Sequence, residues 1–381
     1  MLSIFYLVPY KHTKIRKRIG KNTNFVLQFE TNIMATISII GIGQIGSALA
    51  FVAAANGNLV RLVGTPVDKE VVDACKRDGQ HPKLDKPYPA GTEYYYCEDW
   101  QEAVKGSDFV IGAISSFGVD WFLEEILKKL DPAMPVLSAA KGLADLGNGK
   151  LGSYPDYWVR ALRKCGIRRN IYALGGPGTA MGIMHHDHTQ VVICGKDTAL
   201  LKMMKKALQT SWFHFSLTKD AKGLETAVAI KNAYALGVSM ALGYARKTHG
   251  DEDDAHYNSQ AAVFTQAVKE MIRILELQNA HFDSTLIGIG DLYVTATGAR
   301  TRQLGLMLGE GKTCEEAQAL LGGMTLESLV VIRRLANSIN IRASKGQVNL
   351  EDFPLLRFVI GVLDSGKVEE LPWDRFTFEN I

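Results

Sequence analysis

One lysine stands inside a long segment that otherwise holds apolar and small residues. Between Glu225 and Arg246, Lys231 is the only charged side chain. This composition predicts a helix that is buried on most sides, where an ammonium needs a partner or a lowered pKa. A lysine that loses its proton near neutral pH suits general acid and base chemistry on an alcohol or ketone. The alternative is a lysine whose stem carries its charge out to water.

A glycine-rich stretch at 288–302 is the second candidate. Its polar members, in order, are Asp291, Thr295, Thr297, Arg300, Thr301 and Arg302. Glycines beside hydroxyls suit an anion pocket, in which an arginine clamps a phosphate through two parallel hydrogen bonds. Asp291 could then hold either the Lys231 ammonium or a substrate hydroxyl. The alternative is an ordinary loop between two helices, with capping residues.

The third candidate is the segment Gly41-Ile42-Gly43-Gln44-Ile45-Gly46, which has the spacing GxGxxG. It directly follows an apolar run at 36–40 and opens a helical pattern of small residues at 47–55. In such a strand–turn–helix unit the first glycine permits the turn and the second lets backbone approach a pyrophosphate. The third brings helix close to strand, and the helix N-terminus faces the phosphates. The segment predicts dinucleotide binding, with a tight turn that binds no ligand as the alternative.

The end of the second expected strand bears on the choice between NAD and NADP. An acid there binds the ribose hydroxyls of NAD. Neither Gly64 nor Thr65 is acidic, and Asp68 lies a few residues later. Thr65, with Arg61 or Lys69, could instead accept a 2′-phosphate. NADP is therefore slightly favoured over NAD.

Short apolar runs alternate with helical patterns from Thr36 to about Ser216. The runs typical of buried strands are 36–40, 59–63, 108–114, 135–139 and 190–194. A helical pattern at 117–130 lies between two of them. This alternation predicts a parallel sheet with right-handed crossovers.

Helical patterns dominate after Lys219, and no strand is expected there. The expected helices are 223–247, 261–279, 301–309, 313–321 and 326–338. The predicted fold class is α/β: a Rossmann-type doubly wound parallel sheet at 34–219, followed by an all-helical substrate and catalytic domain at 220–381. Residues 1–33 are expected to be a disordered basic extension or upstream sequence, with a targeting role as the alternative.

The charge balance excludes two classes of partner. The net charge is +3, and much of the positive charge lies in residues 1–33, so the body is close to neutral. Neither nucleic-acid binding nor membrane binding is expected. The apolar run of the extension, at 4–9, is far too short to span a membrane.

The cysteines and two polar clusters bear on the compartment of the protein and on metal binding. Five cysteines, odd in number and without a CxxC spacing, predict reduced thiols in a reducing compartment, and hence a cytoplasmic protein. The histidines at 185–188 and the acids at 251–254 are expected to lie on solvated loops or at a rim, with a metal site as the alternative. No metal is predicted.

The N-terminal half of the chain, including Gly79-Gln-His-Pro-Lys-Leu84, resembles archaeal-type NAD(P)-dependent glycerol-3-phosphate dehydrogenases most. Five signatures in order carry the resemblance to this family. They are the glycine segment 41–46, Ala139-Ala-Lys-Gly-Leu143, Gly176-Pro-Gly-Thr-Ala180, Ala229-Ile-Lys-Asn-Ala233 and 288–302. The resemblance runs from about Met34 to about Leu363. It implies interconversion of dihydroxyacetone phosphate and sn-glycerol 3-phosphate with NADP or NAD, which feeds glycerophospholipid synthesis, and it implies a homodimer.

The resemblance also implies roles for individual residues. Lys231 would be the catalytic acid and base, and Asp291 would orient it. The substrate contacts would be Lys141, Gly176, Gly178, Lys231, Asn232, Asp291, Arg300 and Thr301. The cofactor contacts, which include the glycine segment, would be Gly41, Gly43, Gln44, Ile45, Gly46, Thr65, Ser115, Lys141, Ala180, Arg300, Thr325 and Glu327.

Three departures from the family pattern bear on substrate identity more than on the reaction type. Thr301 stands where the family usually has asparagine, Ala299 where it has serine, and Met181 where it has glutamate. The competing hypotheses are a dehydrogenase for another phosphorylated polyol or a hydroxy acid, and a non-enzymatic redox sensor. A sensor would not need Lys231, Asp291 and Arg300 together.

Overall fold

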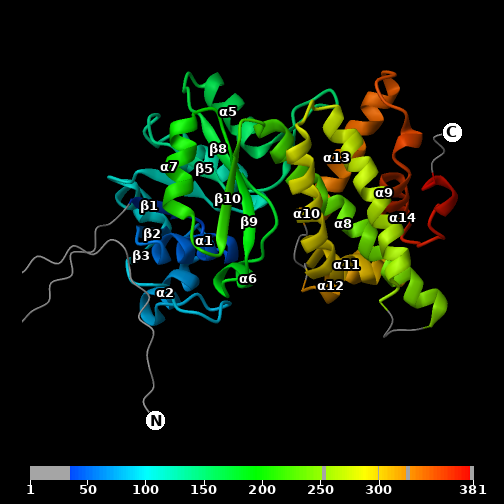
Figure 1. Cartoon of the computed structure of the whole chain (residues 1–381), viewed down its shortest axis with the longest axis horizontal. Coiled ribbons are helices and arrows are strands. Elements are labelled where there is room, and N and C mark those ends of the chain that lie inside the picture. The colour runs from blue at the N-terminus through cyan, green and yellow to red at the C-terminus, as the bar shows by residue number, and fades with distance from the viewer. Residues whose placement is uncertain (1–34, 251–254, 299, 323–326, 378–381) are drawn as a thin grey trace, which may run out of the picture.

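In the computed structural model the chain forms a sheet domain and a helical domain that lie side by side (Figure 1). The structure describes residues 35–250, 255–298, 300–322 and 327–377. The extension predicted at 1–33, the acidic run at 251–254, Ala299 and Thr325 lie outside the described residues. The sheet ends at Thr218, and the first helix of the helical domain begins at Ala221.

Eight strands form the sheet, in the order β10-β9-β8-β5-β4-β1-β2-β3. Their bounds are β1 Thr36–Ile40, β2 Leu59–Val63, β3 Thr92–Tyr95, β4 Phe109–Gly112, β5 Val136–Ser138, β8 Ile171–Gly175, β9 Thr189–Cys194 and β10 Phe213–Thr218. The chain leaves β1 toward β2 on one side and returns to β4 on the other. The carboxyl ends of β1 and β4 therefore border the crevice in which such sheets bind ligands.

Six of the eight strands are parallel, and the predicted α/β fold class is confirmed. The last two strands differ from the prediction, because β9 pairs antiparallel with β8 and carries β10 with it. Between β8 and β9 the only helix is α6, Ala180–Met184, of five residues. A parallel return needs a longer crossover that covers the sheet.

Among the described residues, five helices of the sheet domain pack on its strands. They are α1 Gln44–Ala55, α2 Lys69–Asp78, α3 Trp100–Val104, α5 Tyr154–Lys164 and α7 Thr198–Leu208. The helix predicted at 117–130 is irregular: a 3-10 turn at 116–118 leads into α4, Val119–Trp121, and a π-helical turn at 122–127.

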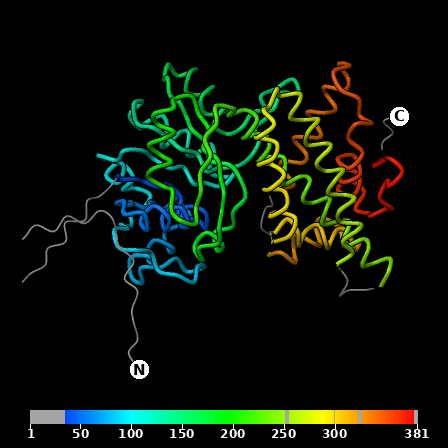
Figure 2. The backbone as a smooth tube through the Cα atoms, viewed as in Figure 1, coloured from blue at the N-terminus to red at the C-terminus, as the bar shows by residue number. Residues whose placement is uncertain are grey.

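A hairpin that the sequence did not reveal joins the two domains. Its strands are β6, Leu143–Asp145, and β7, Leu151–Ser153. Figure 2 shows this segment, in teal-green, reaching from the sheet domain to the helical domain. There Ser338 donates a hydrogen bond of 2.6 Å to the Gly149 carbonyl, and Arg334 donates to the Leu143 carbonyl.

The helical domain is built around α8, against which most of its other long helices pack (Figure 1). The helices are α8 Ala221–His249, α9 Tyr257–Glu276, α10 Phe282–Gly298, α11 Arg300–Gly309, α12 Cys314–Leu320, α13 Glu327–Ser344 and α14 Pro354–Ser365. As predicted, the described part of this half contains no strand. Within the described ranges, no helix has both the length and the apolarity to cross a membrane.

Small residues let two helices approach α8 closely. A Cβ added at Gly288 of α10 would lie 2.7 Å from Cβ of Ala227, and one at Gly305 of α11 would lie 2.7 Å from the Leu236 carbonyl oxygen. Real side chains do not approach that closely, so a larger residue would separate the helices. These glycines serve helix packing.

Candidate active site

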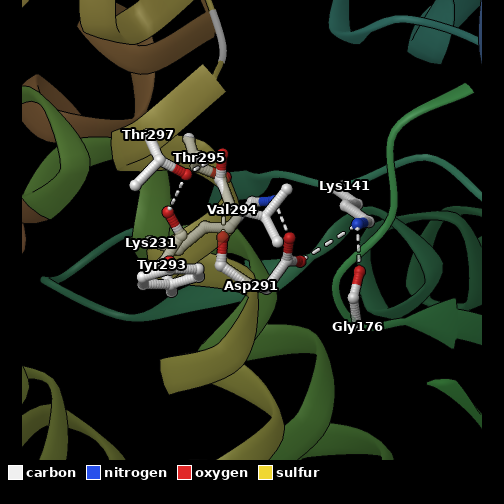
Figure 3. A network of polar contacts seen from close by, with 8 residues as sticks. All are labelled: Lys141, Gly176, Lys231, Asp291, Tyr293, Val294, Thr295 and Thr297. Atoms are coloured by element: carbon white, nitrogen blue, oxygen red, sulfur yellow. Dashed lines mark hydrogen bonds and ion pairs between the residues drawn. The ribbon is translucent and has the colours of Figure 1, made fainter. Parts of the chain in front are cut away.

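A carboxylate buried between the two domains holds two lysines. Lys231 lies in the third turn of α8, Asp291 in the middle of α10, and Lys141 in the loop after β5. Lys231 Nζ donates to Asp291 Oδ1, and Lys141 Nζ lies 3.0 Å from Asp291 Oδ2 (Figure 3). Lys141 Nζ also donates to the Gly176 carbonyl at 2.9 Å. Residues 150 positions apart in the sequence thus form one network.

The glycine contact between α10 and α8 sets this geometry. Lys231 follows Ala227 by about one helical turn, and Asp291 follows Gly288 by nearly one turn. Because Gly288 rests directly on Ala227, the next turns of both helices bring carboxylate and ammonium together. Only 1% of the Asp291 surface and 8% of the Lys231 surface is exposed, so water screens the pair little.

Burial changes the proton affinity of the Lys231 ammonium. It lowers the pKa of Lys231 to about 8; the nearby Asp291 carboxylate raises this pKa, and the Lys141 ammonium lowers it. Near neutral pH the group is still largely protonated but gives up its proton readily. This behaviour is what a general acid for a ketone and a general base for an alcohol require.

The glycine-rich stretch is not the loop or pocket that its composition suggested. Residues 282–298 form α10, and the hydroxyls of Thr295 and Thr297 donate to carbonyls of that helix, at 2.7 and 2.8 Å (Figure 3). The prediction that these hydroxyls line an anion pocket is therefore wrong. Arg300 begins α11 and is exposed, whereas Thr301 is buried.

The glycine turn after β1 fits a dinucleotide pyrophosphate. Gly41 has φ +113°, and a Cβ there would overlap the Ala113 carbonyl at the end of β4. Around Gly43, in contrast, an added Cβ would meet nothing within 4 Å. The N-terminus of α1 has no side-chain cap and no acid in its first turn, and Gln44 and Ile45 are exposed. Backbone N–H groups in open space at a helix N-terminus bind phosphate.

A carboxylate does lie at the end of β2, and it belongs to Asp68. Its Oδ2 accepts hydrogen bonds from the Thr65 backbone at 2.9 Å and from the Thr65 hydroxyl at 2.6 Å. Arg61 points elsewhere: it donates to the carbonyls of Ala103 and Lys105. The prediction that Arg61 lies near a 2′-phosphate is therefore wrong.

Family models match both domains. The model described as NAD-dependent glycerol-3-phosphate dehydrogenase N-terminus matches residues 36–201, and the C-terminus model of the same family matches residues 220–371. The chain belongs to this family. The family resemblance predicted from the sequence is confirmed, and so is the prediction of an NAD(P)-dependent enzyme.

Relatives and solved structures agree with the family. The NADP(+)-dependent glycerol-3-phosphate dehydrogenase of Archaeoglobus fulgidus is 29% identical over 90% of this chain and 99% of its own length. The NAD(P)+ glycerol-3-phosphate dehydrogenase of Myxococcus xanthus is 29% identical over 72% of this chain and 79% of its own. The Coxiella burnetii glycerol-3-phosphate dehydrogenase structure has a TM-score of 0.73 at 22% identity, over 90% of this chain and 97% of that one, which shows the shared fold.

The remaining expected substrate contacts of this glycerol-3-phosphate dehydrogenase family member lie around the lysine network. Gly176, with φ +127°, turns the chain after β8 so that its carbonyl meets Lys141. Gly178 follows in the same loop, and Asn232 is half-buried beside Lys231 on α8. These positions are compatible with the expected roles, which stay predictions.

The remaining expected cofactor contacts differ in accessibility. Ser115 is exposed directly after β4, across the crevice from the glycine turn. Glu327 begins α13, and its Oε1 accepts a hydrogen bond of 3.0 Å from the Ser116 backbone. The side chain of Ala180 packs in the core of the sheet domain. Thr325 lies outside the described part of the chain.

The histidines of the 185–188 segment have separate partners. His185 pairs with Asp85 at 2.7 Å, and His188 lies 3.0 Å from His214. His186 stacks on Trp212, with ring centroids 3.9 Å apart. These side chains diverge from one another.

Sequence reasoning missed two contributors to the site. The sequence indicates both Lys141 and Asp291 but not the bond between them. In the sequence Glu225 marks only the end of an apolar segment, yet it contacts the sheet domain. An acid near the start of a buried helix was the available signal, because burying a carboxyl group needs a reason.

Proposed function

We propose that the chain catalyses reduction of dihydroxyacetone phosphate to sn-glycerol 3-phosphate by NAD(P)H, and the reverse oxidation. The observation that carries the proposal is the buried ammonium of Lys231, with its lowered pKa, fixed by Asp291 between two domains. The pyrophosphate turn at Gly41–Gly46 supports it, as does family membership.

In the reduction, Lys231 Nζ donates a proton to the substrate carbonyl oxygen, which becomes the hydroxyl of the product. A bound nicotinamide would supply a hydride, which is a proton with two electrons, to the adjacent carbon. Asp291 keeps the ammonium in place by accepting its hydrogen bond, and Lys141 shares that carboxylate. In the oxidation, the neutral amine of Lys231 takes the hydroxyl proton back.

The phosphate of the substrate needs a cation outside this network. Arg300 follows α10 directly and is exposed at the start of α11, and its guanidinium can bind phosphate through two hydrogen bonds. Thr301 and Asn232 are the further substrate contacts that we propose. A hydroxy acid or another phosphorylated polyol is the alternative substrate, and the departures at Met181 and Thr301 are its support.

We propose NADP as the favoured cofactor, with NAD also accepted. Its support is the Archaeoglobus fulgidus relative, whose name specifies NADP(+), and the absence of an acid at Gly64 and Thr65. The Asp68 carboxylate at the end of β2 opposes it. Gly43, Gln44, Ile45 and Ser115 are the contacts that we propose around the pyrophosphate, with Lys141, Ala180, Arg300, Thr325 and Glu327 farther along the cofactor.

Three broader proposals follow from the family. We propose that the protein is a cytoplasmic homodimer and that its product enters glycerophospholipid synthesis. Light scattering of the purified protein tests the dimer, and a mass of one chain at micromolar concentration would contradict it. Fractionation of cells tests the location.

The decisive experiment is an initial-rate assay with NADPH and NADH. The substrates are dihydroxyacetone phosphate, unphosphorylated dihydroxyacetone and a panel of 2-keto acids. Turnover of the phosphorylated ketone, with kcat/KM at least about a hundredfold above dihydroxyacetone, is expected because a bidentate phosphate contact is worth several kcal/mol. Preference for a keto acid would contradict the proposal, and binding of NADPH without any turnover would indicate a sensor.

A further inference from the structure

Glu225 lies six residues before Lys231 on α8, and the reaction proposed above gives it no role. Its Oε2 accepts a hydrogen bond from the Ser153 hydroxyl, and its Oε1 lies 3.9 Å from the Cys194 sulfur, whose thiol donates. Ser153 ends β7, and Cys194 ends β9. One side chain of the helical domain therefore contacts two strands of the other domain.

The same carboxyl group borders a small cavity next to the lysine network. Its walls include Glu225, the loop 140–142 and the segment 173–175 at the end of β8. The loop carries Lys141, and the segment runs directly into Gly176, whose carbonyl accepts from Lys141 Nζ. Glu225 thus lines the same cavity as both chain segments that place the second lysine.

The surroundings of the Glu225 carboxyl group favour its neutral form. Burial raises its pKa to about 8, and the negative charge of Asp156 on α5 adds to this effect, whereas the Cys194 hydrogen bond lowers the pKa. The Cys194 thiol is itself buried, and its pKa is raised well above the ordinary value. A neutral, hydrogen-bonded carboxyl group joins two domains without a buried counter-charge.

Glu225 and Lys231 belong to one rigid helix, separated by a rise of about 9 Å. The Ser153 bond holds that helix against the hairpin that continues the Lys141 loop, and Asp291 accepts from both lysines. A displacement of α8 relative to this loop would open one of the two lysine contacts. Misplacement by about 1 Å costs on the order of a hundredfold in rate.

We propose that Glu225 is a positioning residue for the reductase reaction. By hydrogen bonds to Ser153 and Cys194, it fixes α8 relative to the Lys141 loop and so keeps both ammonium groups on Asp291. The inference rests on the proposed function, because its main readout is turnover of dihydroxyacetone phosphate.

The test compares Glu225→Leu with Glu225→Gln. Leucine fills similar volume without hydrogen bonds, whereas glutamine can still accept from Ser153 and face the Cys194 sulfur. Glu225→Leu should lower kcat at least about tenfold, with the Kd for NADPH, from fluorescence titration, within about twofold of wild type. Glu225→Gln should restore kcat to within about threefold of wild type. Hydrogen exchange of the backbone amides 139–143 should be faster than in wild type for Glu225→Leu but not for Glu225→Gln.

Glu270 supplies a matched control. It is another carboxyl group with a raised pKa, about 7, but it lies on α9 and accepts from the Leu355 and Leu356 backbones inside the helical domain. Glu270→Gln should lower the melting temperature and leave kcat, measured well below that temperature, within about twofold of wild type. If Glu225 had only a structural role, its substitution would likewise lower the melting temperature and leave kcat unchanged.

Ser153→Ala tests the same contact from the other side, in case Glu225→Leu does not fold. It should lower kcat at least about threefold in the wild-type background. It should have little further effect in the Glu225→Leu background, where the shared bond is already absent. A folded Glu225→Leu or Ser153→Ala variant with kcat within twofold of an active wild type would overturn the inference. A wild type that does not reduce dihydroxyacetone phosphate would refute the proposed function, and the inference with it.

Discussion

At Lys231, opposing effects set the proton affinity of the ammonium. Burial disfavours the charged form, Asp291 stabilises it, and Lys141 disfavours it again. The Asp291 carboxylate is shared between two cations, so neither lysine has a full counter-charge. The result is a pKa of about 8, close to the working pH of a general acid, which an exposed lysine could not provide.

Lys231→Met tests the acid–base role. The change should lower kcat by about 10²–10⁴-fold, the usual contribution of general acid catalysis, because no other described group donates to the substrate oxygen in the proposed mechanism. The Kd for NADPH should change less than about threefold, since Asp291 keeps its contact with Lys141. Steady-state rates and fluorescence titration measure both. A variant that retained a tenth of wild-type activity would contradict the role.

The two reaction directions should respond oppositely to pH. Reduction needs the protonated ammonium, so its kcat should fall as pH rises through about 8, where Lys231 loses its proton. Oxidation needs the neutral amine, so its kcat should rise over the same range. Rates from pH 6 to 10 in both directions check this. Parallel profiles in both directions would show that another group titrates.

Asp68 should act against NADPH. Its carboxylate, held by Thr65 at the end of β2, repels a 2′-phosphate and accepts ribose hydroxyls. Asp68→Ala should therefore raise the ratio of kcat/KM for NADPH to that for NADH by about tenfold, the worth of one hydrogen bond to a charged group. Thr65→Val, which removes only the hydroxyl donor, is the control with a smaller shift. Equal changes for both cofactors would place the carboxylate outside the ribose site.

At the scale of elements, the sequence predicted those helices and strands whose formation depends mainly on their own residues. The sequence predicted the strands at 36–40 and 59–63 and the apolar helix around Lys231, because the apolar residues of each segment indicate that it is buried. The helix α10 was missed because its glycines, at Gly288 and Gly290, each disfavour an isolated helix by about 1 kcal/mol. Packing against α8 outweighs that preference, and no local pattern reveals a contact with Ala227, 61 positions away.

Substitutions at two glycines of α10 distinguish the effect of helix packing from the effect of helix propensity. Gly288→Ala places a Cβ 2.7 Å from that of Ala227, so it should push α10 from α8, lower the melting temperature and reduce kcat at least about tenfold by displacing Asp291. At Gly290 an added Cβ would meet only Pro177, at 3.7 Å. Gly290→Ala should therefore raise the stability by up to about 1 kcal/mol. Thermal melts and kinetics of both variants are the measurement, and equal effects would contradict this account.

At the scale of the whole molecule, the site exists only because two domains meet. Lys141 and the glycine turn come from the sheet domain, and Lys231 and Asp291 from the helical domain. The sequence indicated each group but not their junction, since the bonds that form it join residues 72 to 211 positions apart, as Ser153–Glu225 and Ser116–Glu327 do. The hairpin β6–β7 and the start of α13 are the elements that carry those bonds.

Glu327→Ala should loosen this junction at the crevice. The Glu327 carboxylate accepts from the Ser116 backbone, in the turn that follows β4 opposite the glycine turn, and such a bond to a charged group contributes about 1.5–3 kcal/mol. Its loss should raise the KM for NADPH by about tenfold or more while kcat at saturation falls less than about threefold, because the lysine network is untouched. Asp364→Ala is the control. It removes an exposed ion pair with Arg333, which lies on α13 like Glu327, and exposed ion pairs contribute little to stability. A Glu327→Ala variant whose KM stays within twofold of wild type would show that the turn after β4 holds its position without the helical domain.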